Sequence, residues 1–351
     1  MVELSIIVPT YNEAENLEQL VSGIFKSLQG RDFELIIVDD NSPDGTGKLA
    51  DELAQQHKNI RVVHRPGKLG LGTAILDGMA FARGEIIGVI DADLQHPPGV
   101  LRKMLERAEG GADIVVASRY VHGGGVEGWS LVRKIVSKGA LWLSHLFLPQ
   151  TKNVKDTLSG CFLFRKKVVK GASIDVKDFK LLIEILVKGK YERIVEVPYI
   201  FRPRVAGKSK LGARQIFSYM KQLLRLSEYR ILKFMAVGVS GIFVNNGILW
   251  LLVASSILPP LFAEIFSIEA SILSNFILNN FWTFKGRASG GIIYRLLKYH
   301  GSVLVGAVVN YVVFALLLSL GLHILVANTI GILIGFIFNY LLSETFVWRW
   351  V

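Results

Sequence analysis

Four stretches in the last third of the chain are long and apolar enough to cross a lipid bilayer. They cover residues 232–257, 261–283, 299–320 and 323–347. A helix needs about 20 apolar residues to span the hydrocarbon core, and each stretch meets that length. Pro259-Pro260, residues 285–298 and Gly321 separate the stretches. The sequence therefore predicts a membrane domain of four spanning helices over residues 231–351.

The charges around these stretches predict an orientation. Basic residues lie before the first stretch, between the second and third, and in the tail, while the other two loops contain no lysine or arginine. Loops rich in positive charge stay in the cytoplasm, so we expect the catalytic domain and both termini there. The net charge of +11 fits contact with anionic lipid and with phosphorylated substrates. No nucleic-acid-binding module is visible.

The membrane domain contains an internal repeat. Gly241 recurs as Gly306, Asn275 recurs as Asn339, and SNFILNNFWTF is echoed by FNYLLSETFVW. A duplicated helical hairpin explains this pattern, and glycine and asparagine at depth are typical of packed membrane helices. We expect no charged side chain in the middle of the spans, so the usual mark of an ion or substrate pathway through the bilayer is missing.

Residues 1–120 alternate short apolar runs with amphipathic stretches. The apolar runs LSIIVPT, ELIIVDD, IRVVHR, EIIGVIDAD and ADIVVASR are expected to be strands, and residues 13–29, 44–57, 70–83 and 98–109 to be helices. This alternation is typical of a doubly wound, Rossmann-like α/β sheet. The first residues lack the basic region of a signal peptide, so we interpret them as a strand.

Two further segments, residues 131–148 and 213–229, are amphipathic but too short and too polar to span a membrane. Basic helices with one apolar face suit the membrane interface, although such helices can also pack on a soluble core. We expect an interfacial location because the second segment runs directly into the first span. Both segments are assigned to a soluble domain over residues 1–230.

Asp91 and Asp93 follow an apolar run, at the point where the predicted strand leaves the sheet. The carboxyl edge of an open α/β sheet is where ligands bind, and closely spaced carboxylates suit a hard divalent cation bound with substrate phosphates. Gln95 falls on the same side of an extended loop as the two aspartates. A turn or a helix start is the alternative interpretation of these polar residues.

Several motifs occur in order along the first 212 residues: VPTYNE, VDDNSPDGT, GKLGLG, DADLQHPP and ASRYVHGGGVEGWSLVRKIVSKGA. Together they resemble the polyprenyl-phosphate glycosyltransferases of the GT-A fold, in glycosyltransferase family 2. The last third resembles the GtrA-like four-helix membrane domain. The resemblance implies inverting transfer of mannose from GDP-mannose to dolichyl (polyprenyl) phosphate, with Mg²⁺ or Mn²⁺ held by Asp91, Asp93 and Gln95.

The ends of the first two strands are expected to form the nucleotide pocket. Tyr11 supplies an aromatic ring for the base, and Pro9 and Val38 supply an apolar wall. Acceptors for base and ribose hydroxyls come from Glu13, Asp39 and Asn41. Lys68 lies in a glycine loop that can approach a phosphate, although its spacing is not that of a Walker A motif. The resemblance adds Ala92, between the two metal-binding aspartates, to the donor site.

Arg119, Arg133 and Ser137 are expected to bind the lipid phosphate. A guanidinium gives bidentate contacts to phosphate, and Arg133 and Ser137 are one helical turn apart. The alternative interpretation is a solvated helix face. Asp156 is placed near the acceptor by the resemblance, where it either orients the sugar, acts as a weak base, or has a structural role.

A second basic cluster lies in FRPRVAGKSKLG, with Arg202, Arg204, Ser209 and Lys210. Because this segment contains glycine, we expect it to close over donor and acceptor. Arg204 and Lys210 are assigned to the nucleotide-sugar site, and Arg204 also to the catalytic set. That set comprises Asp93, Arg119, Arg133, Ser137, Asp156 and Arg204.

Three alternative functions were weighed. A processive polysaccharide synthase shares the fold, but its QxxRW motif does not occur here. Transfer of glucose from UDP-glucose to the same lipid phosphate differs only in pocket detail. A lipid-carrier translocator with a regulatory soluble domain is disfavoured by the full set of donor motifs.

Overall fold

The computed structural model describes residues 2–175, 180–203, 212–287 and 290–349. The chain divides into two compact units, Met1–Leu226 and Ser227–Val351. The division falls slightly before the expected boundary at residue 230, because helix α9 (Arg230–Ala254) already begins at Arg230. Arg230 was assigned to the soluble domain from the sequence, but it packs within the second unit.

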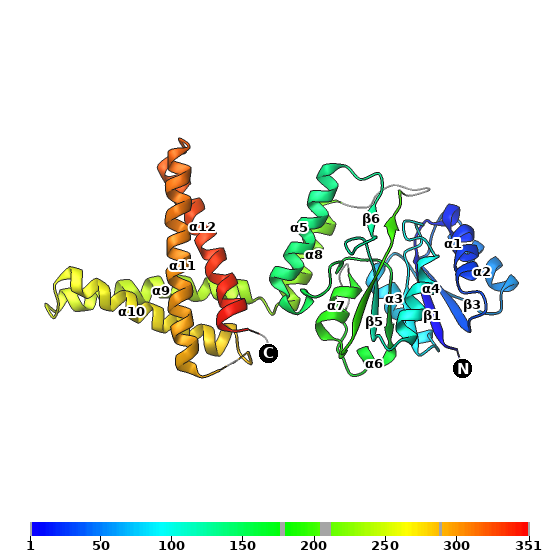
Figure 1. Cartoon of the computed structure of the whole chain (residues 1–351), viewed down its shortest axis with the longest axis horizontal. Coiled ribbons are helices and arrows are strands. Elements are labelled where there is room, and N and C mark those ends of the chain that lie inside the picture. The colour runs from blue at the N-terminus through cyan, green and yellow to red at the C-terminus, as the bar shows by residue number, and fades with distance from the viewer. Residues whose placement is uncertain (1, 176–179, 204–211, 288–289, 350–351) are drawn as a thin grey trace. The chain divides into compact units, whose positions relative to one another are not determined.

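A seven-stranded sheet forms the centre of the first unit, in the order β3-β2-β1-β4-β7-β5-β8 (Figure 1). Its strands are β1 (Leu4–Thr10), β2 (Phe33–Asp39), β3 (Ile60–His64), β4 (Ile86–Val89), β5 (Ile114–Ser118), β7 (Phe162–Arg165) and β8 (Ile194–Pro198). The strands predicted over the first 120 residues are β1 to β5. Strand β7 runs antiparallel to both neighbours, while the other described pairs in this sheet are parallel. Short strands β6 (Gly125–Val126) and β9 (Ile200–Phe201) form a separate pair.

Helices cover both faces of this sheet. The predicted helices are present as α1 (Ala14–Ser27), α2 (Thr46–Gln56), α3 (Leu71–Phe81) and α4 (Val100–Glu109), and α6 (Lys166–Val169) and α7 (Leu181–Lys188) follow β7. Ile6 and Val8 of β1 belong to one hydrophobic cluster, and Ile7 belongs to another. Successive side chains of a strand point to opposite faces, so β1 is buried on both sides. The doubly wound α/β expectation is confirmed.

Helices α5 (Leu131–Phe147) and α8 (Ala213–Leu226) lie side by side (Figure 1), where the Tyr219 hydroxyl donates a hydrogen bond of 2.7 Å to the Ala140 carbonyl. Both helices leave large apolar side chains in solvent, including Leu131, exposed by 73%, and Phe217, exposed by 72%. Such faces suit a membrane interface. Phe147, at the end of α5, is buried.

The second unit consists of two helical hairpins. The described helices α9 (Arg230–Ala254) and α10 (Pro260–Leu278) form the first hairpin, and α11 (Ile292–Ser319) and α12 (Ile324–Leu342) form the second (Figure 1). Four spans within this unit are long and apolar enough to cross a membrane. Each hairpin ends in a π-helical turn, η2 (Asn279–Thr283) and η3 (Ser343–Val347), so the repeat extends to an unusual backbone conformation.

The repeated glycines and asparagines make equivalent contacts. A Cβ placed on Gly241 would lie 2.5 Å from the side chain of Asn275, and one placed on Gly306 would lie 2.7 Å from that of Asn339. The small residue therefore lets an asparagine of the partner helix approach the backbone closely. The two hairpins are built around the same interhelical contact, as the repeat predicts.

A buried ion-pair cluster lies at the helix ends of this unit. Glu344 in η3 is 1% exposed, and it forms an ion pair of 3.2 Å with Arg230 and another with Arg287. Because Glu344 lies at the end of the last span, it does not contradict the expectation of no charge in mid-span. Burying these charges is tolerable because they are paired. At the equivalent place in the repeat, Arg295 donates from Nε to the Asn280 side chain at 3.1 Å.

Candidate active site

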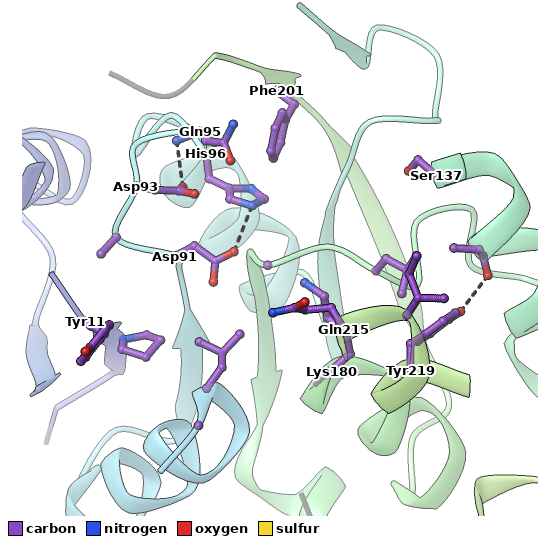
Figure 2. A pocket seen from close by; sticks show the side chains of 18 of the residues that line it. Tyr11, Asp91, Asp93, Gln95, His96, Ser137, Lys180, Phe201, Gln215 and Tyr219 are labelled. Atoms are coloured by element: carbon purple, nitrogen blue, oxygen red, sulfur yellow. Dashed lines mark hydrogen bonds and ion pairs between the residues drawn. The ribbon is translucent and has the colours of Figure 1, made fainter. Parts of the chain in front are cut away.

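A cavity of about 770 Å³ opens at the carboxyl ends of β1 and β4, where the strand order reverses direction from β1. Ligands of doubly wound sheets bind at such switch points. Residues of α5 and α8 and the residue before α7 complete its wall (Figure 2). The predicted residues that line it are Pro9, Tyr11, Glu13, Lys68, Asp91, Ala92, Asp93, Gln95, Arg119, Arg133 and Ser137.

The loop after β4 carries the two aspartates, and close packing fixes Asp91. A Cβ on Gly160 would overlap the Asp91 carboxylate, so only glycine leaves room for it. On its other side, Nε2 of His96 lies 3.7 Å from Asp91 Oδ2. Leu94 adopts a left-handed φ of 59°. This backbone conformation costs free energy for any residue that has a β-carbon, and it is often found at functional sites.

Asp93 and Gln95 lie together on this loop (Figure 2). The backbone N–H of Gln95 donates to Asp93 Oδ1 at 3.2 Å, and Gln95 Nε2 donates to the Arg202 carbonyl at 3.1 Å. The second bond fixes the amide so that its oxygen is directed away from Arg202. Two carboxylates and one amide oxygen are the ligand types that Mg²⁺ and Mn²⁺ prefer, so the residues fit such a cation.

No group of three or more His, Cys, Asp and Glu side chains within the described ranges is arranged to hold a metal. Beside the two aspartates, the loop offers the side-chain oxygen of Gln95 and the imidazole of His96. Burial, followed by the positive charge of Arg119, lowers the pKa of His96 well below its ordinary value, so the imidazole is neutral at neutral pH.

Tyr11 and Lys68 meet at the nucleotide end of the cavity. Nζ of Lys68 lies 3.9 Å from the centroid of the Tyr11 ring, a cation–π contact that joins the glycine loop to the end of β1. Glu13 lies beside them and accepts a hydrogen bond of 2.8 Å from the Asn16 amide. Pro9 contributes the apolar wall at the end of β1.

Three residues predicted for this end do not line the cavity. Val38 is fully buried in the core, Asn41 is exposed with a left-handed φ of 56°, and the Asp39 carboxylate accepts hydrogen bonds from the Thr10 and Ser42 hydroxyls. The neighbouring Asp40 lines the cavity instead and forms an ion pair with Arg65. Two adjacent aspartates at a strand end point to opposite sides, so Asp40 faces the cavity, and the role expected of Asp39 stays a prediction.

Arg119 and Asp156 form a buried pair at the acceptor end. Asp156 accepts from Arg119 Nε at 2.8 Å, from Nη2 at 2.7 Å and from the Arg119 backbone N–H at 2.9 Å. Burial opposes the charge on Arg119, but the hydrogen bonds and charge of Asp156 outweigh it and raise the pKa of Arg119. Asp156 is fully buried and does not line the cavity, which favours, among the three roles left open, the structural one of holding Arg119.

Arg133 and Ser137 lie on α5 above Arg119. The Arg133 guanidinium stands 4.4 Å from the centroid of Trp129, and the Ser137 hydroxyl forms a hydrogen bond of 2.8 Å with the Tyr120 hydroxyl. Trp129 was not predicted, although an aromatic residue just before a basic amphipathic helix is a recognisable signal. Arg119, Arg133 and Ser137 all line this one cavity, and their binding of a lipid phosphate stays a prediction.

The described residues include only the start of the basic segment. Arg204, Ser209 and Lys210 lie outside the described residues, whereas Arg202 is described. The Arg202 backbone N–H donates to the Gln95 carbonyl at 3.1 Å, in addition to the bond from the Gln95 amide. The start of this loop is therefore tied to the loop that carries Asp91 and Asp93.

The cavity is also lined by side chains that the sequence did not single out, and His96 and Lys180 are the basic ones among them. His96 belongs to the DADLQHPP motif and could have been selected from it. Its ring stacks on Tyr199, with centroids 5.0 Å apart. Lys180 belongs to no motif and precedes α7, so no local pattern marks it.

The two units match two protein-family models. Residues 5–171 match glycosyl transferase family 2, and residues 233–349 match the GtrA/DPMS transmembrane domain. Among solved structures, glucosyl-3-phosphoglycerate synthase from Mycobacterium tuberculosis is 21% identical, with a TM-score of 0.49 over 64% of this chain and 80% of that chain. The fold and the site define a glycosyltransferase with a membrane domain.

Two relatives identify the family within this class of glycosyltransferases. The dolichol-phosphate mannosyltransferase of Pyrococcus furiosus is 46% identical over 351 residues, which is 99% of this chain and 99% of that protein. The dolichol-phosphate mannosyltransferase of Saccharomyces cerevisiae is 34% identical over 241 residues, covering 65% of this chain and 88% of the yeast protein. The chain belongs to the dolichol-phosphate mannosyltransferase family.

Proposed function

We propose that this enzyme transfers mannose from GDP-mannose to dolichyl phosphate with inversion, giving a β-linked product from an α-linked donor. The observation that carries this proposal is a single cavity with an acidic, oxygen-rich end at Asp91, Asp93 and Gln95 and a basic end at Arg119 and Arg133. The first suits a nucleotide diphosphate bound with a cation, and the second suits a phosphate monoester. Family membership supports the sugar and the lipid.

The acceptor phosphate acts as the nucleophile. Its second ionisation lies near 6, so at neutral pH it is already mostly dianionic and needs no strong base. The tasks left to the protein are to position the incoming phosphate and to stabilise the departing diphosphate. Asp156, the carboxylate expected near the acceptor, is occupied by Arg119. That occupation favours a single displacement over a covalent sugar–enzyme intermediate.

Asp91, Asp93 and Gln95 would hold Mg²⁺ or Mn²⁺ against the diphosphate. When bound, the cation supplies charge stabilisation to the leaving GDP. The protein supports this site from outside through Gly160, which makes room for Asp91, and through the Arg202 carbonyl, which orients the Gln95 amide.

The lipid end of the cavity is shaped for an amphiphile. Leu143 of α5 and Ile216 and Met220 of α8 line it together with Arg133 and Ser137. Apolar side chains beside phosphate-binding groups suit a polyprenyl chain that enters from the membrane surface. We place the catalytic unit and both termini in the cytoplasm on the basis of the loop charges.

A donor competition assay tests this proposal. The full-length enzyme in detergent is supplied with polyprenyl phosphate and equal amounts of GDP-mannose and UDP-glucose, with Mg²⁺ or Mn²⁺ added after chelation. We expect mannosyl lipid to dominate. Glucosyl lipid as the main product would assign the enzyme to glucose transfer. A lack of sugar transfer from either donor, together with movement of lipid phosphate between leaflets by the enzyme in proteoliposomes, would support a translocator.

A further inference from the structure

Lys180 lies in the wall of the cavity, and none of the predicted functions uses it. Its side chain extends from the start of α7 toward the loop that carries Asp91 (Figure 2). The charges that act on it most strongly are those of Asp91 and Arg119, which line the cavity, and of Asp156, which is buried behind it and paired with Arg119. A lysine at this place can reach a phosphate that approaches the sugar.

Helix α8 holds the backbone of Lys180 in position. The Lys180 N–H donates to Gln222 Oε1 at 3.2 Å, and Gln222 Nε2 donates to the Lys180 carbonyl at 2.9 Å. Gln222 is fully buried. Its side-chain oxygen and nitrogen both bond to the backbone of Lys180, which lies 42 positions earlier in the sequence. One helical turn later, Arg225 donates to Glu184 at 2.9 Å, which attaches α8 to α7 a second time.

The opposite face of α8 is apolar and exposed. Ile216 is exposed by 55% and Phe217 by 72%, whereas Gln222 and Arg225 face α7. The helix that offers an apolar surface to the membrane is therefore the one that fixes Lys180. Ile216 and Met220 of the same helix line the lipid end of the cavity.

We propose that Lys180 binds the phosphate of the lipid acceptor during transfer, and that Gln222 is the positioning residue that holds Lys180 in place. The proposal rests on the transfer reaction proposed above. Lys180 is partly enclosed by protein, and burial lowers the pKa of its ammonium below the ordinary value while Asp91 opposes that change. A phosphate dianion bound beside it would favour the charged form further.

Substitution of Lys180 tests the first part. Lys180→Met keeps the length of the side chain and removes its charge, and we expect kcat/KM for polyprenyl phosphate to fall about 10- to 100-fold, as for loss of a hydrogen bond to a charged group. Binding of farnesyl phosphate should weaken, while binding of GDP should not. The matched control is Lys190→Met, because Lys190 is exposed in the same unit.

Chemical rescue separates a charge from a structural role. Lys180→Cys should lose activity, and alkylation with 2-bromoethylamine should restore it by rebuilding an ammonium at nearly the same position. The wild type is a suitable control since its one cysteine, Cys161, is fully buried and burial raises the pKa of its thiol. Mass spectrometry verifies the modification at residue 180.

The role of Gln222 is tested by a double-mutant cycle. Gln222→Met should reduce lipid-phosphate use in the wild-type background and add nothing in the Lys180→Met background, because its effect passes through Lys180. Lys221→Ala is the control on the exposed face of α8. Additive losses would remove the positioning role from Gln222.

Three results would overturn the role of Lys180: full activity in Lys180→Met, no recovery of the modified Lys180→Cys protein, or equal weakening of GDP and farnesyl phosphate binding. Failure of the reaction itself is distinguishable. If the wild type transfers no sugar to a lipid phosphate, the proposed function falls, while the farnesyl phosphate comparison between wild type and Lys180→Met still tests Lys180.

Discussion

Arg119 and Asp156 form a side-on ion pair inside the catalytic unit, with the guanidinium donating from Nε and Nη2 to the two carboxylate oxygens at 2.8 and 2.7 Å. Asp156 is fully buried. Removing its charge leaves a buried arginine without compensation, which typically costs about 3–5 kcal/mol. We expect Asp156→Asn to lower the free energy of unfolding of the catalytic unit by that amount, as measured by denaturant unfolding.

The matched control for Asp156 is Glu106→Gln, which breaks the exposed pair with Arg102 at 3.6 Å and should change stability by less than about 1 kcal/mol. Asp156→Asn should also reduce lipid-phosphate use, because Arg119 is no longer oriented. An Asp156→Asn enzyme with normal stability and no transfer at all would instead give the carboxylate a direct catalytic role.

If Asp93 binds the cation, its substitution should affect turnover and its dependence on metal. Asp93→Ala should abolish metal-dependent turnover, since it removes an oxygen ligand and with it diphosphate stabilisation worth several kcal/mol. Initial rates measured against Mn²⁺ and Mg²⁺ concentration provide the test, with the exposed Asp51→Ala as control. Near-normal turnover with an unchanged metal requirement would remove Asp93 from the metal site.

Arg133 is predicted to act on the acceptor alone. Arg133→Ala should weaken use of the lipid phosphate by about 1.5–3 kcal/mol, the range for a hydrogen bond to a charged group, with nucleotide binding nearly unchanged. Separate KM values for lipid and donor measure this, and Lys134→Ala on the exposed side of α5 is the control. Equal losses for both substrates would place Arg133 at the donor end.

The membrane unit allows a comparison of two glycines on one helix. Gly241 contacts Asn275, whereas a Cβ on Gly238 would meet nothing within 4 Å. Gly238→Ala should be neutral or gain up to about 1 kcal/mol from helix propensity, but Gly241→Ala should lower the thermal midpoint of the full-length enzyme in detergent. Gly306→Ala should match Gly241→Ala, because the repeat gives it the same contact with Asn339. Equal midpoints for Gly238→Ala and Gly241→Ala would contradict the close approach seen here.

The sequence predicted the strand ends well because the pattern of apolar and polar residues that marks a strand end is local in the chain. Apolar runs that end in polar residues mark β1, β2 and β4, and parallel pairing then brings their ends together. The sequence did not indicate that Asp40 lines the cavity, since Asp39 and Asp40 are adjacent and only the register decides which one faces it. Adjacent polar residues at a strand end are therefore the weakest part of such a prediction.

Long-range partners explain what the sequence missed. Lys180 is held by hydrogen bonds with Gln222, 42 residues later in the sequence. Glu344 is buried in a pair with Arg230, 114 residues earlier. Neither relationship has a local signature. Asn280 and Arg295 form the equivalent contact in the other copy of the repeat, but the repeat did not predict that one copy would be charged.

Truncation tests what the four spans contribute. Removing residues 232–351 keeps α8 whole, together with the Gln222 contact to Lys180 and every described residue that lines the cavity. Metal and nucleotide affinity should remain near the full-length values. Transfer should fall chiefly at low lipid concentration, because membrane attachment raises the effective concentration of enzyme and lipid phosphate for one another, and it should recover when lipid is raised. The measurement is transfer rate against lipid concentration for both proteins in mixed micelles, with circular dichroism to verify folding. A folded, GDP-mannose-binding truncation that cannot transfer at any lipid concentration would show that the spans form part of the acceptor site and are more than an anchor.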